Sequence, residues 1–248
     1  MVKMIFGIGE ESISKENTIY ENYTDVTSIN YLLFFDSRGL TINEPDFEKS
    51  HLYLLINHLK NAGKSFLAIS RPKNLTVFAT LDNFLQLNPE LKFDNLITNL
   101  GFVDCTPKKE SNIRDIEIQM TQFDINDSTV KHHNAYQLSD GTIEILKNLE
   151  YSDRYLHDIT RFLEQKFKML YFINTPIMDE SITFSRQRPS SFFAQLAHTN
   201  TLIRKMVNST SFSRLIDVKD MSFSYDGVHY TKEGHSLFFE KIIRCIKI

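Results

Sequence analysis

The sequence predicts an α/β protein, a three-layer α/β/α sandwich around a mainly parallel five-stranded sheet. Two observations predict it: short apolar runs stop at polar loops, and longer segments of helical periodicity alternate with them. Strands that alternate with helices need crossover connections, which make the sheet parallel and place helices on both of its faces. The chain of 248 residues is 42% hydrophobic, enough to bury a large core, and we expect a single domain over residues 1–248.

The first half of the chain supplies three of the expected strands and two helices. Residues 31–35, YLLFF, form a continuous apolar run that stops at DSRG, which is typical of a buried parallel strand that meets a loop. Residues 46–62 carry leucines at roughly helical spacing and end at Gly63, a residue type that commonly follows the end of a helix. The other two strands and the second helix are expected at residues 65–69, 93–100 and 75–87.

The second half begins with a stretch that departs from this alternation. Residues 105–140 are polar and charged, and we expect an insertion or lid there, with a hairpin as one form of it. A long amphipathic helix is predicted for residues 142–167. The remaining elements are expected as a strand at 169–173, a loop at 178–192, a helix at 193–207, a strand at 215–218 and a final helix at 232–246.

Composition narrows the partners and the compartment. The net charge is −3 and no basic stripe is apparent, which argues against nucleic acid as a partner. No apolar run is long enough to span a bilayer, and the opening residues make a poor signal peptide, so we expect a cytoplasmic protein. Cys105 and Cys245 are far apart and match no metal-binding spacing, so we expect free thiols, no metal and no cofactor. The oligomeric state stays open.

Polar residues follow several of the predicted strands. In an open parallel sheet, ligands bind beyond the carboxyl ends of the strands. Ser37, Arg71, residues 101–104, Asn174 and the turn at 226–229 all come after a predicted strand. We therefore expect them to share one surface.

The stretch at residues 226–235, DGVHYTKEGH, carries the strongest chemical signal. Asp226 and His229 lie three residues apart in a Gly-containing turn just before the last helix. A Ser-His-Asp site needs a neutral imidazole near the hydroxyl and a carboxylate on the other ring nitrogen, and this turn can supply both. The alternative is that Asp226 and Gly227 form a plain turn and that His229 is a surface residue before a helix capped by Thr231.

Ser37 is the candidate nucleophile. It follows Asp36 at the end of a buried strand, so it would lie at the mouth of the sheet, where its own backbone N–H can point at a developing oxyanion. The alternative is a loop serine, or an Asp-Ser pair that opens a helix.

These segments resemble the conserved blocks of the SGNH (GDSL-type) hydrolase superfamily. DGVHYTKEGH resembles the last block, which holds the Asp and His of the triad; FDSRGLT at residues 35–41 resembles the first block; and LGFVD at 100–104 resembles the third, usually Gly-x-Asn-Asp. The three blocks occur in the family's order. The resemblance implies a flavodoxin-like sandwich of the SGNH hydrolase type, with Ser37, Asp226 and His229 as catalytic residues.

The sequence departs from the family pattern at the oxyanion donors. Val103 stands where the third block supplies an Asn side chain, and the second-block region, SRPKN at residues 70–74, has no Gly. Pro72 in that region has no N–H to donate. Losing one such donor typically costs about 10²–10³ in rate. The candidate oxyanion or substrate-binding residues are Arg38, Arg71, Asn74, Gly101 and Asp104, with Asn99 a further possible donor.

Three functions follow from this pattern. The first is a serine esterase or acyl hydrolase that acts on an ester-linked acyl group, acetyl among them, of a small molecule or glycan. The second is an acyltransferase on the same triad, which would hydrolyse slowly and speed up with an added acceptor. The third is a non-catalytic protein that binds a glycan or an acylated ligand, and the altered oxyanion donors motivate it.

Overall fold

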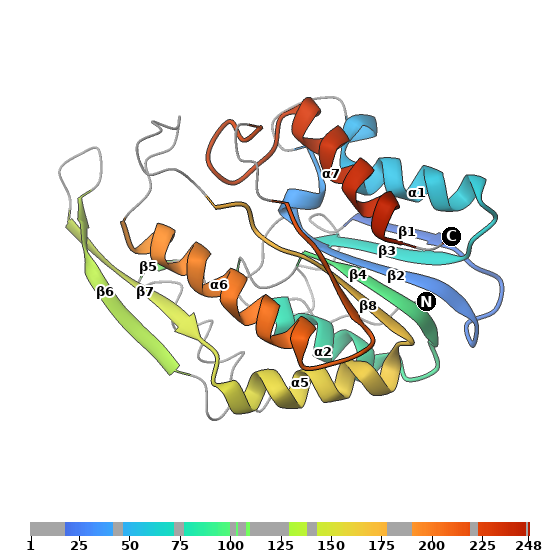
Figure 1. The fold of residues 1–248 in the computed structure, drawn as a ribbon, viewed down its shortest axis with the longest axis horizontal. Helices are drawn as coiled ribbons and strands as arrows, with labels where there is room; N and C mark the ends of the chain where they lie inside the picture. Colours follow the sequence, from blue (N-terminus) through green and yellow to red (C-terminus); the bar gives the residue numbers. More distant parts are fainter. Residues whose placement is uncertain are drawn as a thin grey trace.

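A computed structural model gives the fold (Figure 1). It describes residues 18–41, 47–71, 77–99, 103, 108–109, 129–137, 143–177, 190–218, 223–246 and 248. The prediction of a single domain stays a prediction.

The main sheet has six strands in the order β1-β3-β2-β4-β8-β9. The strands are β1 (Thr18–Asn22), β2 (Ile29–Asp36), β3 (Phe66–Arg71), β4 (Phe93–Thr98), β8 (Met169–Ile173) and β9 (Ser213–Ile216). All neighbours from β3 to β9 pair in parallel, while β1 pairs with β3 in antiparallel register. The five parallel strands thus have the order 2-1-3-4-5 of flavodoxin-like sheets, as expected.

The sheet is mainly parallel because both of its faces are buried. Seven of the eight residues of β2 are buried, the exception being Asn30, which fits a run of apolar residues without polar alternation. Strand β1 was not predicted. It is an antiparallel edge strand of mixed composition, TIYEN, which lacks the apolar run that identified the others.

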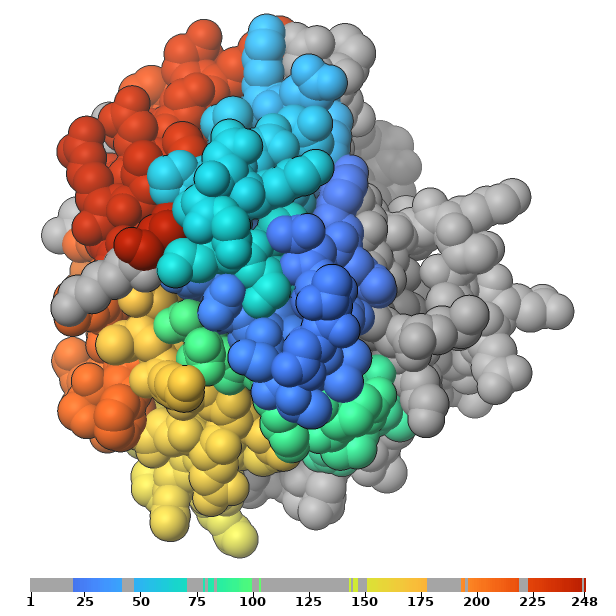
Figure 2. All heavy atoms as spheres, turned by 90° about the vertical axis from the view of Figure 1, so that its right-hand side faces the viewer, coloured from blue at the N-terminus to red at the C-terminus, as the bar shows by residue number. Residues whose placement is uncertain are grey.

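Helices cover both faces, which makes the three layers (Figure 1). On one face lie α1 (His51–Asn61) and α7 (Lys232–Cys245); on the other lie α2 (Val77–Leu87), α5 (Asp153–Lys166) and α6 (Ser190–Asn208). Each face has its own apolar core, with Leu55 and Phe238 in the first and Phe84 and Leu163 in the second. Figure 2 shows α1 and α7 above, and α5 and α6 below, when the molecule is viewed along the layers.

Local signals explain where the helices begin. Ser50, Ser152 and Thr231 are N-caps of α1, α5 and α7, each with a side-chain oxygen that accepts a backbone N–H of the first turn. Gly63 follows the end of α1 with φ of +67°, the left-handed conformation expected of it. The expected helices at 46–62, 75–87, 193–207 and 232–246 are confirmed with shifted ends; residues 47–49 form a 3-10 turn ahead of α1.

The prediction of a helix over residues 142–167 was wrong in its first third. Residues 143–150 form β7 (Ile143–Glu150), which pairs antiparallel with β6 (Thr129–Gln137), and β5 (Lys108–Lys109) pairs with β7 on its other side. The helix begins only at Asp153, after the N-cap Ser152. IEILKNLE fits neither a helical period nor strand alternation cleanly, and pairing with β6 decides its conformation.

This three-stranded sheet also extends past the predicted insertion. The expected boundary was residue 140, whereas β7 runs to Glu150. The antiparallel pairing of β6 and β7 agrees with a hairpin in this region. Most of residues 105–128 lie outside the described residues, as do residues 178–189 of the predicted loop at 178–192. Residues 190–192 of that loop belong to α6 instead. In the described part of the chain, no helix is both long and apolar enough to cross a membrane.

Candidate active site

Ser37 lies at the carboxyl end of the central strand β2. Asp36 ends the strand and caps the 3-10 turn Ser37–Gly39, where its side chain accepts the Arg38 N–H at 2.8 Å. Strands β3 and β4 flank β2, and the chain leaves β2 for β3 on one side and later reaches β4 on the other. This is the topological switch point, where ligands bind in such folds.

The His229 turn is built by local hydrogen bonds. Asp226 Oδ1 accepts the backbone N–H groups of Val228 and His229, at 2.9 and 2.7 Å. Gly227 has φ of +79°, a conformation that a residue with a Cβ adopts at a cost. Beyond the turn, Tyr230 forms an isolated antiparallel bridge with Ser224. The turn is therefore fixed before α7 begins.

The structure brings Ser37, His229 and Asp226 together in one chain of side chains. Ser37 Oγ lies 3.5 Å from His229 Nε2, and His229 Nδ1 lies 2.8 Å from Asp226 Oδ2. The side chains of His229 and Asp226 are 16% and 12% exposed, so the base can be reached from solvent while its acid is mostly covered. The Ser–His distance is long for a hydrogen bond, as it often is in sites without substrate.

The pKa of Asp226 keeps this carboxylate ionised. Burial acts to raise its pKa, but hydrogen bonds from the His229 side chain and backbone, the His229 charge and the Val228 N–H together hold it well below the ordinary value. An ionised Asp226 accepts a hydrogen bond from His229 Nδ1–H, which keeps the proton on Nδ1 and leaves Nε2 as the lone-pair nitrogen that faces Ser37. The arrangement can take a proton from the Ser37 hydroxyl.

Arg38 does not face the surface on which it was expected to bind substrate. Its side chain is 1% exposed, and its guanidinium pairs with Asp36, with Nη2 at 2.8 Å from Oδ2. Nη2 also donates to the Asn99 carbonyl at 2.7 Å, and Nη1 donates to Thr175 Oγ1 at 3.1 Å. These donors are directed to strand ends, so Arg38 is not placed for contact with a ligand.

The other predicted donors lie at least partly outside the described residues. Arg71 ends β3 with its backbone in register with Asp36, but its side chain lies outside the described residues. Asn74, Gly101 and Asp104 also lie outside them. Val103, which stands where the family pattern has a donor Asn, is partly buried and packs against the apolar core beneath α2, α5 and α6.

The side-chain amides of Asn99 and Asn174 form hydrogen bonds within the protein and do not point to a ligand site as free donors. Asn99 Oδ1 accepts the Asp36 N–H and Asn99 Nδ2 donates to Asp36 Oδ1, both at 2.9 Å. Asn174 Nδ2 donates to Asp217 at 2.7 Å, and Asn174 Oδ1 accepts the Val218 N–H at the same distance. Both amides therefore join neighbouring strand ends.

Sequence reasoning missed Tyr230 and Thr175, which contact Arg38. Thr175 follows strand β8 in the way Ser37 follows β2, so its position after a predicted strand could have indicated it. No sequence signal singled out Tyr230, which is 4% exposed.

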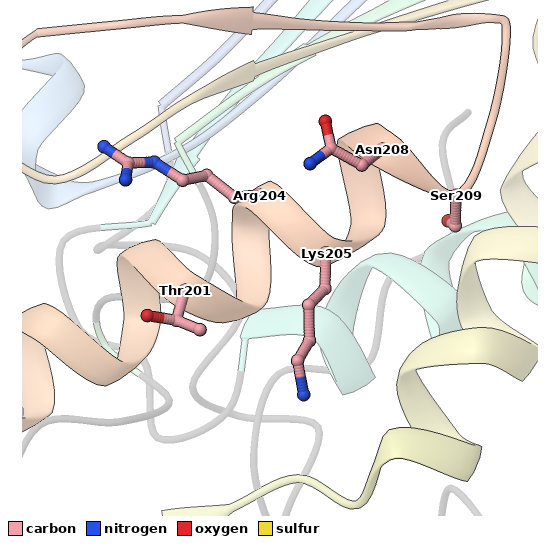
Figure 3. A pocket seen from close by; sticks show the side chains of 5 residues that line it. All are labelled: Thr201, Arg204, Lys205, Asn208 and Ser209. Atoms are coloured by element: carbon pink, nitrogen blue, oxygen red, sulfur yellow. The ribbon is translucent and has the colours of Figure 1, made fainter.

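The described residues show no metal centre, and a hollow lies away from the triad. No three His, Cys, Asp or Glu side chains of the described residues gather where they could share a metal ion. A hollow of about 500 Å³ lies on α6, and in Figure 3 its Arg204 and Lys205 point to opposite sides of the helix. The other lining residues are Thr201, Asn208 and Ser209. Lys205 pairs with Asp153 at 2.9 Å in an exposed ion pair, so the hollow is a solvated surface.

Known proteins resemble this chain in structure and not in sequence. No family model and no curated protein matches the sequence. Among solved structures, the chain is similar to an α/β hydrolase enzyme from the metagenome of Lake Arreo, Spain, at 11% identity and a TM-score of 0.49, over 90% of this chain and 95% of that one.

Two further solved structures come from Sinorhizobium meliloti. The chain is 12% identical to a carbohydrate acetylesterase family member, with a TM-score of 0.47, over 88% of this chain and 97% of that one. It is 13% identical to a second carbohydrate acetylesterase, with a TM-score of 0.45, over 89% and 100%. The description as carbohydrate acetylesterases belongs to those two proteins. At such identities the chemistry of this chain rests on its own site.

Proposed function

We propose that the protein is a serine ester hydrolase that removes an ester-linked acyl group by a Ser-His-Asp mechanism. The observation that carries this proposal is the chain from Ser37 Oγ through His229 to Asp226, at 3.5 and 2.8 Å, at the switch point of a parallel sheet. Ser37 and His229 are 192 positions apart along the chain, and Asp226 is 3 positions from His229. The side chains meet in the order Ser, His, Asp that the reaction needs.

The reaction has two halves in this mechanism. Ser37 Oγ attacks the ester carbonyl carbon while its proton passes to His229 Nε2, and collapse of the tetrahedral intermediate expels the alcohol, which takes that proton. Water then attacks the acyl-serine, again with His229 as base, and releases the acid and the free serine. Asp226 holds the tautomer of His229 and stabilises the imidazolium. We assign the Ser37 N–H to the oxyanion, as the sequence resemblance implies.

The test uses a fluorophosphonate probe and p-nitrophenyl acetate. The wild-type protein should be labelled at one site and should hydrolyse the ester, and Ser37→Ala should lose both reactions. Ser209→Ala is the matched control, because Ser209 lines the hollow on α6 and its hydroxyl donates to the Met206 carbonyl. Full hydrolysis by a folded Ser37→Ala protein would refute the assignment.

A second candidate function is a non-catalytic binder of a glycan or acylated ligand. The observation that favours it is Val103, whose apolar side chain packs on the core where the family pattern has an oxyanion Asn. Such a protein would bind an acetylated sugar without turnover, and its Ser37 would not react with the fluorophosphonate. An acyltransferase would instead react with the probe and speed up with an alcohol acceptor.

A further inference from the structure

Arg38 is an unusual residue to bury beside a nucleophile. Among the described residues it is the largest side chain that is fully buried. Taking a guanidinium out of water is costly unless its charge is paired and its hydrogen bonds are satisfied. The Asp36 carboxylate supplies the pair, with Arg38 Nε at 3.1 and 2.9 Å from its two oxygens.

The Arg38 contacts reach the ends of three neighbouring strands, β2, β4 and β8. Asp36 ends β2, the Asn99 carbonyl follows β4, and the Thr175 hydroxyl follows β8. Asn99 closes the arrangement, since its amide donates to Asp36 Oδ1. One side chain next to the nucleophile thus fixes three neighbouring strands with respect to each other.

Arg38 also contacts the other half of the site. Its guanidinium also interacts with the hydroxyl of Tyr230, the residue directly after His229. Burial raises the pKa of Tyr230 to about 12, with the Arg38 charge opposing and the Asp36 charge adding to the rise, so the hydroxyl stays neutral. The Tyr230 ring packs on Phe238 of α7, with ring centroids 4.2 Å apart.

We propose that Arg38 and Tyr230 are positioning residues that hold His229 in register with Ser37. The Ser37–Gly39 turn and the 226–229 turn come from opposite ends of the chain, and this buried interaction between Arg38 and Tyr230 joins the residue after Ser37 to the residue after His229. This inference rests on the proposed ester hydrolysis and adds the device that sets the Ser–His distance. Neither residue touches substrate.

Tyr230→Phe is the sharpest perturbation, because it removes one hydroxyl and leaves the ring packing and the Asp36/Arg38 pair in place. We expect the rate of fluorophosphonate labelling at Ser37 and kcat for p-nitrophenyl acetate to fall about tenfold or more, the size of one lost hydrogen bond to a charged group. KM should stay within about twofold, since a change confined to kcat marks an interaction that acts on the reaction and not on ground-state binding.

Tyr171→Phe is the matched control. Tyr171 is 3% exposed and belongs to the same apolar core, but it lies in β8 and precedes no triad residue. If loss of any buried tyrosine hydroxyl slowed the reaction by loosening the fold, both variants would lose rate in proportion to their loss of stability. We expect only Tyr230→Phe to lose rate at a temperature where both are fully folded.

Arg38→Lys gives a second, independent readout. Lysine keeps the charge for Asp36 but lacks the planar fork that reaches Tyr230 and the strand ends together. We expect it to fold and to label more slowly than wild type, and a crystal structure of either variant should show a longer Ser37 Oγ to His229 Nε2 distance.

The outcomes separate this inference from the function beneath it. A wild-type protein that reacts, with a folded Tyr230→Phe variant that reacts at the same rate, overturns the positioning role and leaves the hydrolase standing. A wild-type protein whose Ser37 does not react overturns the proposed function, and the positioning role with it.

Discussion

Two histidines are buried against each other between α1 and α7, and they should make the fold sensitive to acid. His51 and His235 are 1% and 0% exposed, and their Nδ1 atoms lie 2.9 Å apart. The His51 backbone N–H donates to His235 Nδ1 at 3.2 Å, so that atom is an acceptor and His51 Nδ1 must carry the hydrogen between the rings. Protonation of His235 Nδ1 would place its new N–H directly against the N–H groups of His51 and break these hydrogen bonds.

The electrostatic surroundings agree with this geometry. Burial and, to a lesser extent, the His229 charge lower the pKa of His235 to about 4, with the Leu40 backbone opposing the change. Burial, the partner His235 and the Arg38 charge also hold the pKa of His51 well below its ordinary value. Both rings are therefore neutral in the folded protein at neutral pH.

The magnitude follows from linkage between proton binding and folding. In the unfolded chain His235 binds a proton with its ordinary pKa of 6.5, whereas in the folded protein its pKa is about 4. The unfolded state therefore binds more protons as the pH falls below 6.5, and stability is lost until the pH reaches about 4. Between pH 7.5 and 5 this one residue removes about 2 kcal/mol from the free energy of unfolding. Because the pKa of His51 is also lowered in the folded protein, His51 adds a further loss of stability as the pH falls.

Urea unfolding of wild type and His235→Asn at pH 7.5, 6 and 5 measures this loss. Asparagine cannot titrate, and its Oδ1 can take the place of Nδ1 as acceptor for the two His51 groups. We expect the variant to lose about 2 kcal/mol less than wild type over this range, whatever its stability at pH 7.5. Asp226 does not interfere, since its carboxyl is ionised in both states above pH 5.

His157→Asn is the control, because the His157 side chain on α5 is 61% exposed. It should reproduce the wild-type pH dependence. The reasoning is refuted if His235→Asn retains the full wild-type loss of stability between pH 7.5 and 5, or if the exposed control changes it as much.

Three further predictions concern single residues. Asp226→Asn should lower kcat on p-nitrophenyl acetate by about 10⁴-fold with the fold intact, because the tautomer of His229 is then wrong; a loss below tenfold would contradict the triad. Gly227→Ala should cost about 1–2 kcal/mol in urea unfolding, because φ at this position is +79°, and an unchanged midpoint would contradict the turn. Ser152→Ala should cost about 1 kcal/mol by removing the N-cap of α5, and Ser209→Ala, outside any N-cap, should not.

The fold was predictable where one signal dominated. The strands at 169–173 and 31–35 are apolar runs bounded by loops, and burial on both faces of the sheet is what such runs require. Strand β7 was not predictable in the same way, since Ile143 and Ile145 are exposed while Leu146 is buried, so neither period is clean. Its conformation is decided by pairing with β6, a contact that local sequence does not contain.

The candidate site shows the same division. Asp226 and His229 could be linked from sequence because three residues and one turn determine their contact. Arg38 could not be placed, because an arginine beside a loop serine is ordinarily exposed. Its burial depends on acceptors 61 and 137 residues away, and such partners emerge only when the strand order is known.

The strand order also explains why α7 matters to the proposed chemistry. The chain enters the 226–229 turn after the edge strand β9, yet Ser37 follows the central strand β2, so the turn must return across two strands to reach it. What holds it there is α7 and the residue before its N-cap: Phe238 and Ile242 are buried in the core of the α1 face, and Tyr230 interacts with Arg38. His235 lies in this same contact. Protonation that loosens α7 from α1 would therefore separate His229 from Ser37 before it disturbs the opposite face, and acid should remove activity at a higher pH than it unfolds α2, α5 and α6.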